Sequence, residues 1–208
     1  MINSACFLND NNNNYITSNK KKYEYDNVIN NVIIENIKIF DFNGNKIKEI
    51  NNSNNSTFFI DTYYDNKLSK IFIITGNHGF SQSYDYNENK IYFKYIDDNI
   101  IDDNNIDNNF HMSIIIDNTD KIIKMIESSC TGLIIIWNFC STQLLNKIKF
   151  INDWLYSVCL WNKDYLFVRC KDCSIKLIKL NEKKIIMSMN GHEEKVLTIR
   201  KYIHFIYG

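Results

Sequence analysis

The 208-residue chain contains no proline, one alanine (Ala5) and two arginines (Arg169 and Arg200). All three residue types have GC-rich codons, so we interpret the shortage as a result of AT-rich coding DNA rather than of the fold. Neither sign of charge is in excess, because Lys+Arg and Asp+Glu both total 24. A chain without net charge has no overall field that attracts it to nucleic acid or to an anionic membrane, and we expect neither partner.

Long apolar runs are also missing. None approaches the roughly 18 residues that a membrane-spanning helix needs, and residues 1–10 lack the basic region and apolar core of a secretory signal. The six cysteines are therefore expected to be reduced thiols rather than a disulfide framework. These absences predict a protein of the cytoplasm or nucleus.

Sequence patterns of catalysis are missing as well. The chain has no Gly-rich phosphate loop, no Gly-x-Ser-x-Gly elbow and no His-Glu-x-x-His motif. Cys170 and Cys173 form one CxxC, but without a second pair or spaced histidines it is a weak sign of zinc or redox chemistry. We expect no enzymatic activity, no cofactor and no metal.

What the chain does contain is a series of short runs rich in Ile, Tyr, Phe and Val, separated by Asn, Asp, Gly and Lys. Such runs suit the pleated, half-buried surface of a β-sheet, and no stretch sustains a helical period. The sequence therefore predicts an all-β protein. The clearest of the expected strands are 71–75, 113–116, 133–139, 165–169 and 175–180.

Four segments repeat one layout of four strands, in which the third strand closes on an aromatic residue followed by a polar one. The pairs recur roughly every 40–50 residues, which is the repeat length of a β-propeller blade with four antiparallel strands. They are Phe40-Asp41, Tyr84-Asp85, Trp137-Asn138 and, in degenerate form, Leu177-Ile178.

The chain resembles the WD40-repeat proteins in Gly132–Asn138 (GLIIIWN), in Asp172–Leu177 (DCSIKL) and in Gly191-His192 followed by VLTI. The resemblance implies a buried hydrogen-bonded set of His, Ser/Thr, Asp and Trp in each blade. That set is incomplete here, because Asp172 belongs to a repeat without a Gly-His pair, and His78 and Thr131 stand where two other aspartates would be. We therefore expect blades that are less rigidly tied than well-matched ones.

We assign the repeats to residues 2–50, 58–96, 110–150 and 154–189, with a fifth that begins at 191 and reaches 208. WD40 propellers usually close with seven blades, so the resemblance implies a fragment of a longer propeller. The alternative is a short chain that completes its ring with another chain, and open blade edges would also favour self-association.

The resemblance implies a non-catalytic scaffold for protein–protein interaction. The alternatives are a structural subunit of a large intracellular assembly and a non-catalytic part of a larger multidomain enzyme. Two insertions, Asn19–Asn31 and Asp97–Asn109, are expected on the face that WD40 domains commonly use for partners, or are length drift in solvated loops. We expect Trp161 in the core, whereas Trp154 suits the core or the surface equally. The candidate partner-binding residues are Asn77, His78, His111, Ser129, Trp154, Tyr156 and Lys171.

Overall fold

The computed structural model describes residues 2–7, 15–19, 35–41, 43–52, 59–77, 79–97, 111–117 and 121–191. Every regular element in these residues is a β-strand, which confirms the predicted all-β class. Within the same ranges, no helix has the length and apolar character that a bilayer crossing requires.

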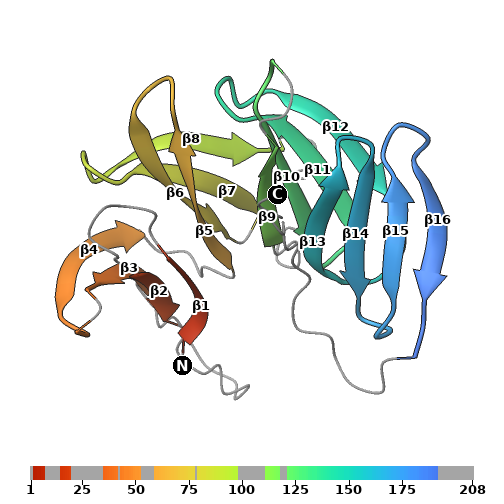
Figure 1. Cartoon of the computed structure of the whole chain (residues 1–208), viewed down its shortest axis with the longest axis horizontal. Coiled ribbons are helices and arrows are strands. Elements are labelled where there is room, and N and C mark those ends of the chain that lie inside the picture. The colour runs from red at the N-terminus through yellow and green to blue at the C-terminus, as the bar shows by residue number, and fades with distance from the viewer. Residues whose placement is uncertain are drawn as a thin grey trace, which may run out of the picture. The chain divides into compact units, whose positions relative to one another are not determined.

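The strands form four sheets of four, and in each sheet the strands are neighbours in chain order. Figure 1 shows these sheets as successive meanders, from red at the N-terminus to blue at the C-terminus. The first sheet contains β1 (Ile2–Phe7), β2 (Tyr15–Asn19), β3 (Glu35–Phe40) and β4 (Lys46–Asn52). The second contains β5 (Phe59–Asp65), β6 (Lys70–Gly76), β7 (Phe80–Asp85) and β8 (Lys90–Ile96).

The third sheet contains β9 (His111–Asp117), β10 (Lys124–Ser129), β11 (Leu133–Asn138) and β12 (Leu144–Lys149). The fourth contains β13 (Leu155–Asn162), β14 (Tyr165–Cys170), β15 (Ile175–Lys179) and β16 (Lys184–Met189). The chain divides into two compact units, Met1–Ile114 and Ile115–Gly208. The first unit holds the first two sheets, and the second unit holds the last two apart from the start of β9.

The polar residues that close the strands build the hairpin turns. Oδ1 of Asp85 accepts backbone N–H bonds from the second and third residues that follow it, at 2.9 and 3.0 Å, and Oδ1 of Asn138 does the same at 3.1 and 3.2 Å. Each turn then contains a residue with positive φ, Asn89 at 55° and Thr142 at 58°. Because short polar side chains satisfy the turn backbone locally, a polar residue recurs at these positions. The degenerate pair Leu177-Ile178 lies inside β15 instead and builds no turn.

Apolar side chains fill one core in each unit. In the first unit, the buried residues come from β3 to β7. In the second unit they come from β10 to β15, and Ile185 of β16 packs against them. Alternation along each strand directs one set of side chains inward and the other outward. The largest members are Tyr84 in the first unit and, in the second, the isoleucines and leucines of positions 126, 134, 136, 148, 155, 166, 178 and 180.

The tryptophan at the end of β13 does not lie in the core. Trp161 is 52% exposed, so the predicted core role is wrong. The physical reason is the register shift between Leu160 and Asn162 at this end of β13, where the indole lies beside the Phe167 ring at a centroid distance of 5.7 Å, on the face opposite the core residues Leu166 and Val168. Trp154, immediately before this strand, is 37% exposed and lies at the surface.

Candidate functional site

Three connections meet on one side of the second unit: the β10–β11 turn, the β12–β13 connection and the β14–β15 turn. We call this surface the turn face. The N–H of Phe150 donates to the carbonyl of Gly132 at 3.1 Å, and the N–H of Lys171 donates to the carbonyl of Trp154 at 3.1 Å. Gly132 has φ +83°, and a Cβ atom there would lie 1.9 Å from the carbonyl oxygen of Ile151. Only glycine fits this approach, and the three connections are thereby held against one another.

Aromatic rings and cations gather at this turn face. The rings of Trp154 and Tyr156 are 5.5 Å apart at an angle of 52°. Nζ of Lys171 lies 5.8 Å from the Trp154 ring, and Cζ of Arg169 lies 4.1 Å from the Tyr156 ring. We call these four residues the aromatic–cation cluster. Each cation lies within the range in which a ring quadrupole attracts it.

Arg169 is the most buried member of this cluster. It is 3% exposed, and its Nε and Nη2 atoms have no hydrogen-bond partner among the described residues. In β14, Leu166, Val168 and Cys170 face the core, so alternation places Arg169 on the opposite face of the sheet, beside Tyr156. A buried guanidinium without a carboxylate is costly, and stacking on Tyr156 offsets about 2 kcal/mol of that cost.

The other charges of the turn face are paired. Nζ of Lys171 lies 3.8 Å from the Asp153 carboxylate, and Nζ of Lys176 lies 2.9 Å from that of Asp172. Burial acts to raise the pKa of Asp172, but hydrogen bonds from Lys176 and Ser174 outweigh it and lower the pKa to about 2. Asp172 is therefore ionised at neutral pH, and among the described residues Arg169 remains as the cation without a counter-charge.

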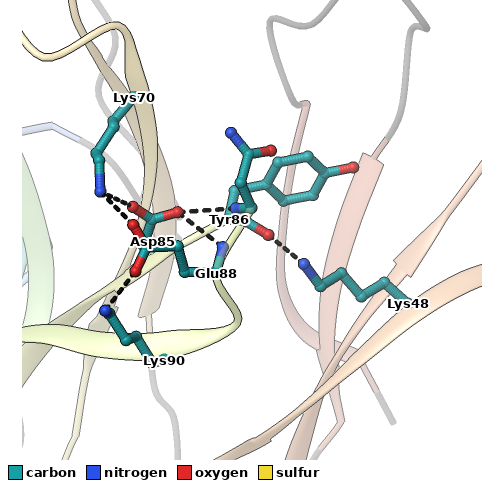
Figure 2. A network of polar contacts seen from close by, with 7 residues as sticks. Lys48, Lys70, Asp85, Tyr86, Glu88 and Lys90 are labelled. Atoms are coloured by element: carbon teal, nitrogen blue, oxygen red, sulfur yellow. Dashed lines mark hydrogen bonds and ion pairs between the residues drawn. The ribbon is translucent and has the colours of Figure 1, made fainter.

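A second polar network lies in the first unit, at the β7–β8 turn (Figure 2). The buried Asp85 carboxylate forms an ion pair with Nζ of Lys70 at 2.6 Å, and the same Nζ lies 2.7 Å from the Glu88 carboxylate. Burial acts to raise the pKa of Asp85, but Lys70 and the turn N–H groups lower it overall, and the two carboxylates raise the pKa of Lys70. Since every one of these charges is paired within the network, we interpret it as structural.

Lys48 connects this network to the first sheet. It extends from β4 and donates to the carbonyl of Tyr86, and its Nζ lies 4.8 Å from the Tyr86 ring (Figure 2). Burial lowers the pKa of Lys48, and the Asp85 charge offsets part of this effect. The contact joins the outer strand of the first sheet to a turn of the second.

The CxxC pair spans the β14–β15 turn, with Cys170 ending β14 and Cys173 in the turn. Cys170 is 1% exposed, and burial raises the pKa of its thiol, which disfavours the thiolate that metal binding or nucleophilic attack requires. Among the described residues, no group of three His, Cys, Asp or Glu side chains is arranged to hold a metal ion. Cys130 and Cys159 are also buried, as expected for small apolar side chains, and the side chain of Cys6 lies outside the described residues.

A comparison with known protein structures identifies the fold. A crystal structure of the WD40 β-propeller domain of Doa1 superposes with a TM-score of 0.67 at 12% sequence identity. The match covers 96% of this chain and 58% of that one, so the chain spans a little over half of that propeller's length. This chain has a WD40 β-propeller fold. No protein-family model and no curated protein sequence matches it.

Within this WD40 fold, three of the candidate partner-binding residues come together. Trp154, Tyr156 and Lys171 belong to the aromatic–cation cluster. Ser129 lies on the same turn face but is fully buried, and its hydroxyl oxygen accepts the N–H groups of Thr131 and Leu133 at 3.3 and 3.2 Å. That hydroxyl shapes the β10–β11 turn of the third WD40 blade.

The remaining candidates lie elsewhere or outside the described residues. Asn77 lies in the first unit, fully buried, and its amide donates to the Thr75 hydroxyl at 3.0 Å. His78 and His192 are outside the described residues, as is the side chain of His111 in β9. Of the two insertions, only their flanks are described: Asn19 ends β2, and Asp97 is 5% exposed.

The residues of the WD40 repeat motif have separate roles. Trp137 and Tyr84 are buried, Phe40 is half-buried, and the Asp41 carboxylate accepts the N–H of Asn45 at 2.8 Å. Asp172 accepts hydrogen bonds from the N–H and hydroxyl of Ser174 at 3.0 and 2.6 Å, which fixes its own turn. Gly191, with φ +123°, is the last described residue.

Sequence reasoning missed Arg169. Its strand reads YLFVRC, in which a single cation stands among apolar residues. An arginine in a chain that otherwise uses lysine almost throughout was the available signal, because arginine offers a planar fork of donors that lysine lacks.

Proposed function

We propose that this chain is part of an intracellular WD40 scaffold that binds another protein through the turn face of its second unit. The observation that supports this proposal is the aromatic–cation cluster, in which an exposed Trp154 and a cation at Lys171 stand on three interlocked connections. Tryptophan, tyrosine and arginine carry a large share of binding energy at protein interfaces. Rigid support lowers the entropic cost of ordering such side chains on binding.

The proposal includes the organisation and location of the chain. The four sheets are taken as consecutive blades of one propeller that the repeat at 191–208 continues, and the chain acts in the cytoplasm or nucleus without catalysis. The paired charges of the Asp85 network and the raised pKa of the Cys170 thiol offer no group poised for acid–base or nucleophilic work.

The experiment compares Trp154, immediately before β13, with Trp161, near the end of that strand. Tagged wild-type chain, Trp154→Ala and Trp161→Ala are expressed in the cells of origin, and the co-purifying proteins are quantified by mass spectrometry. Trp161 is the more exposed of the two and lies at the opposite end of β13, so it controls for general loss of surface area. We expect Trp154→Ala to lose a partner that Trp161→Ala retains, by roughly thirtyfold for a hot-spot residue. If both variants retain the same proteins as the wild type, the turn face is not the interaction site.

A further inference from the structure

The sequence contains the dipeptide Asn-Gly twice, at Asn43-Gly44 and at Asn190-Gly191. In this dipeptide the backbone nitrogen of the glycine can attack the side-chain carbonyl carbon of the asparagine, because glycine has no Cβ atom that hinders the approach. The attack requires that nitrogen to give up its proton and to move toward the side chain. Solvent exposure does not distinguish the two pairs, because all four residues are exposed.

The first pair is held in the β3–β4 turn by hydrogen bonds. The N–H of Gly44 donates to the carbonyl of Asp41 at 3.0 Å, and the N–H of Asp41 donates to the carbonyl of Asn45 at 3.0 Å. The Asp41 carboxylate also accepts the backbone N–H and the side-chain amide of Asn45, at 2.8 and 2.9 Å. The nitrogen that would attack Asn43 is therefore the donor that closes this turn, and its attack breaks the turn.

The second pair lies beyond the end of a strand. β16 ends at Met189, so Asn190 and Gly191 follow the last paired residue of the fourth sheet. Among the described residues, none accepts a hydrogen bond from the N–H of Gly191. Gly191 has φ +123°, and a Cβ atom built on it meets nothing within 4 Å, so its backbone lies in open space. Its nitrogen can move toward Asn190 without breaking a turn of the kind that holds Gly44.

We infer that Asn190 is a site of spontaneous deamidation, whereas the β3–β4 turn protects Asn43. The nitrogen of Gly191 bonds to Cγ of Asn190, and its proton passes through water to Nδ2. The Cγ–Nδ2 bond breaks, and ammonia leaves. Water then opens the five-membered succinimide ring and leaves aspartate or isoaspartate at position 190.

The product alters the turn face. Strands β15 and β16 are antiparallel with Met189 opposite Ile175, so Asn190 lies at the end of the fourth sheet that carries the β14–β15 turn. Deamidation adds a negative charge there, on the side that already holds Asp153 and Asp172, and isoaspartate also lengthens the main chain by a carbon atom. The charge of the turn face therefore changes with the age of the molecule. This chemistry proceeds whether or not the turn face binds a partner.

The test incubates the full folded chain at mildly alkaline pH in buffer prepared with heavy-oxygen water. Each succinimide that opens takes up a heavy oxygen atom, so mass spectrometry of a rapid acidic digest counts only the events of the incubation. Asn190→Gln and Asn43→Gln are matched controls, because glutamine has to close a larger and slower ring. A parallel incubation in urea removes the hydrogen bonds of the β3–β4 turn.

In the folded chain we expect Asn190 to acquire the label at least about fivefold faster than Asn43, because breaking a hydrogen bond slows a reaction by about that factor. In urea the two rates should converge, and Asn190→Gln should lose the label at its own position and keep that at Asn43. Equal or faster labelling of Asn43 in the folded chain overturns the inference, as does a label at position 190 no greater than in Asn190→Gln. A rate ratio that persists unchanged in urea also overturns it, because neighbouring residues rather than the fold would then set the order.

Discussion

Gly132 offers a sharp test of how the turn face is built. Replacing it by alanine places a Cβ atom 1.9 Å from the Ile151 carbonyl oxygen and 2.9 Å from that of Asp153, where only backbone can move. The residue also has φ +83°, a region that costs an L-residue roughly 1–2 kcal/mol. Relieving the contact requires the β12–β13 connection to shift, and this breaks the bond from the Phe150 N–H, which contributes about 1 kcal/mol. We therefore expect Gly132→Ala to lower the free energy of unfolding by about 3–5 kcal/mol.

Gly79 is the matched control. It lies in the corresponding turn of the second sheet, between β6 and β7, with φ +75° and nothing within 4 Å of a built Cβ. Gly79→Ala thus carries the backbone strain without the clash and should cost about 1–2 kcal/mol. The difference between the two variants isolates the close approach to Ile151.

The assay is urea unfolding followed by two probes, with the free energy taken from the midpoint and slope. All three tryptophans lie in the second unit, so their fluorescence reports on the unit that contains Gly132, whereas far-UV circular dichroism reports on both. If Gly132→Ala and Gly79→Ala lie within about 0.5 kcal/mol of each other, the connections do not interlock as described. Because the shifted segment includes Asp153, Gly132→Ala should also weaken partner binding through Trp154.

Three further predictions concern charge and packing. Asp85→Asn should lower the free energy of unfolding by about 2 kcal/mol at pH 7. Folding lowers the pKa of Asp85, so its stabilising contribution is present above about pH 4 and is lost as the pH falls through the pKa of the folded state. The urea midpoints of variant and wild type should therefore converge on acidification. Asp172 has a pKa of about 2 when folded, so Asp172→Asn should narrow the midpoint gap between wild type and variant as pH drops from 4 to 2, and a constant gap would contradict the hydrogen bonds from Lys176 and Ser174. Ile134→Ala, in the core of the second unit, should cost about 2–5 kcal/mol, whereas Leu145→Ala at a 40% exposed position should stay within about 0.5 kcal/mol, both measured by tryptophan fluorescence in urea.

The amino-acid sequence by itself determined the class and the layout of this fold. Alternating apolar residues in short runs predict strands because the side chains of a strand alternate between two faces, and that period is visible without a structure. The polar residues at Asp85 and Asn138 marked strand ends because their hydrogen bonds reach only two or three residues along the chain. Interactions of such short range are encoded where they act.

Burial and pairing were decided only in the tertiary structure. Trp154, just before β13, and Trp161, near its end, look alike in the sequence, yet Trp154 joins the turn face, and a register shift leaves Trp161 outside the core. Ser129 and Asn77 looked like surface polar residues and are buried, where each side chain is hydrogen-bonded to residues two to four positions away. Arg169 became a candidate only when β13 placed Tyr156 over its guanidinium, since the partners of a side chain in a sheet come from strands whose register no local pattern specifies.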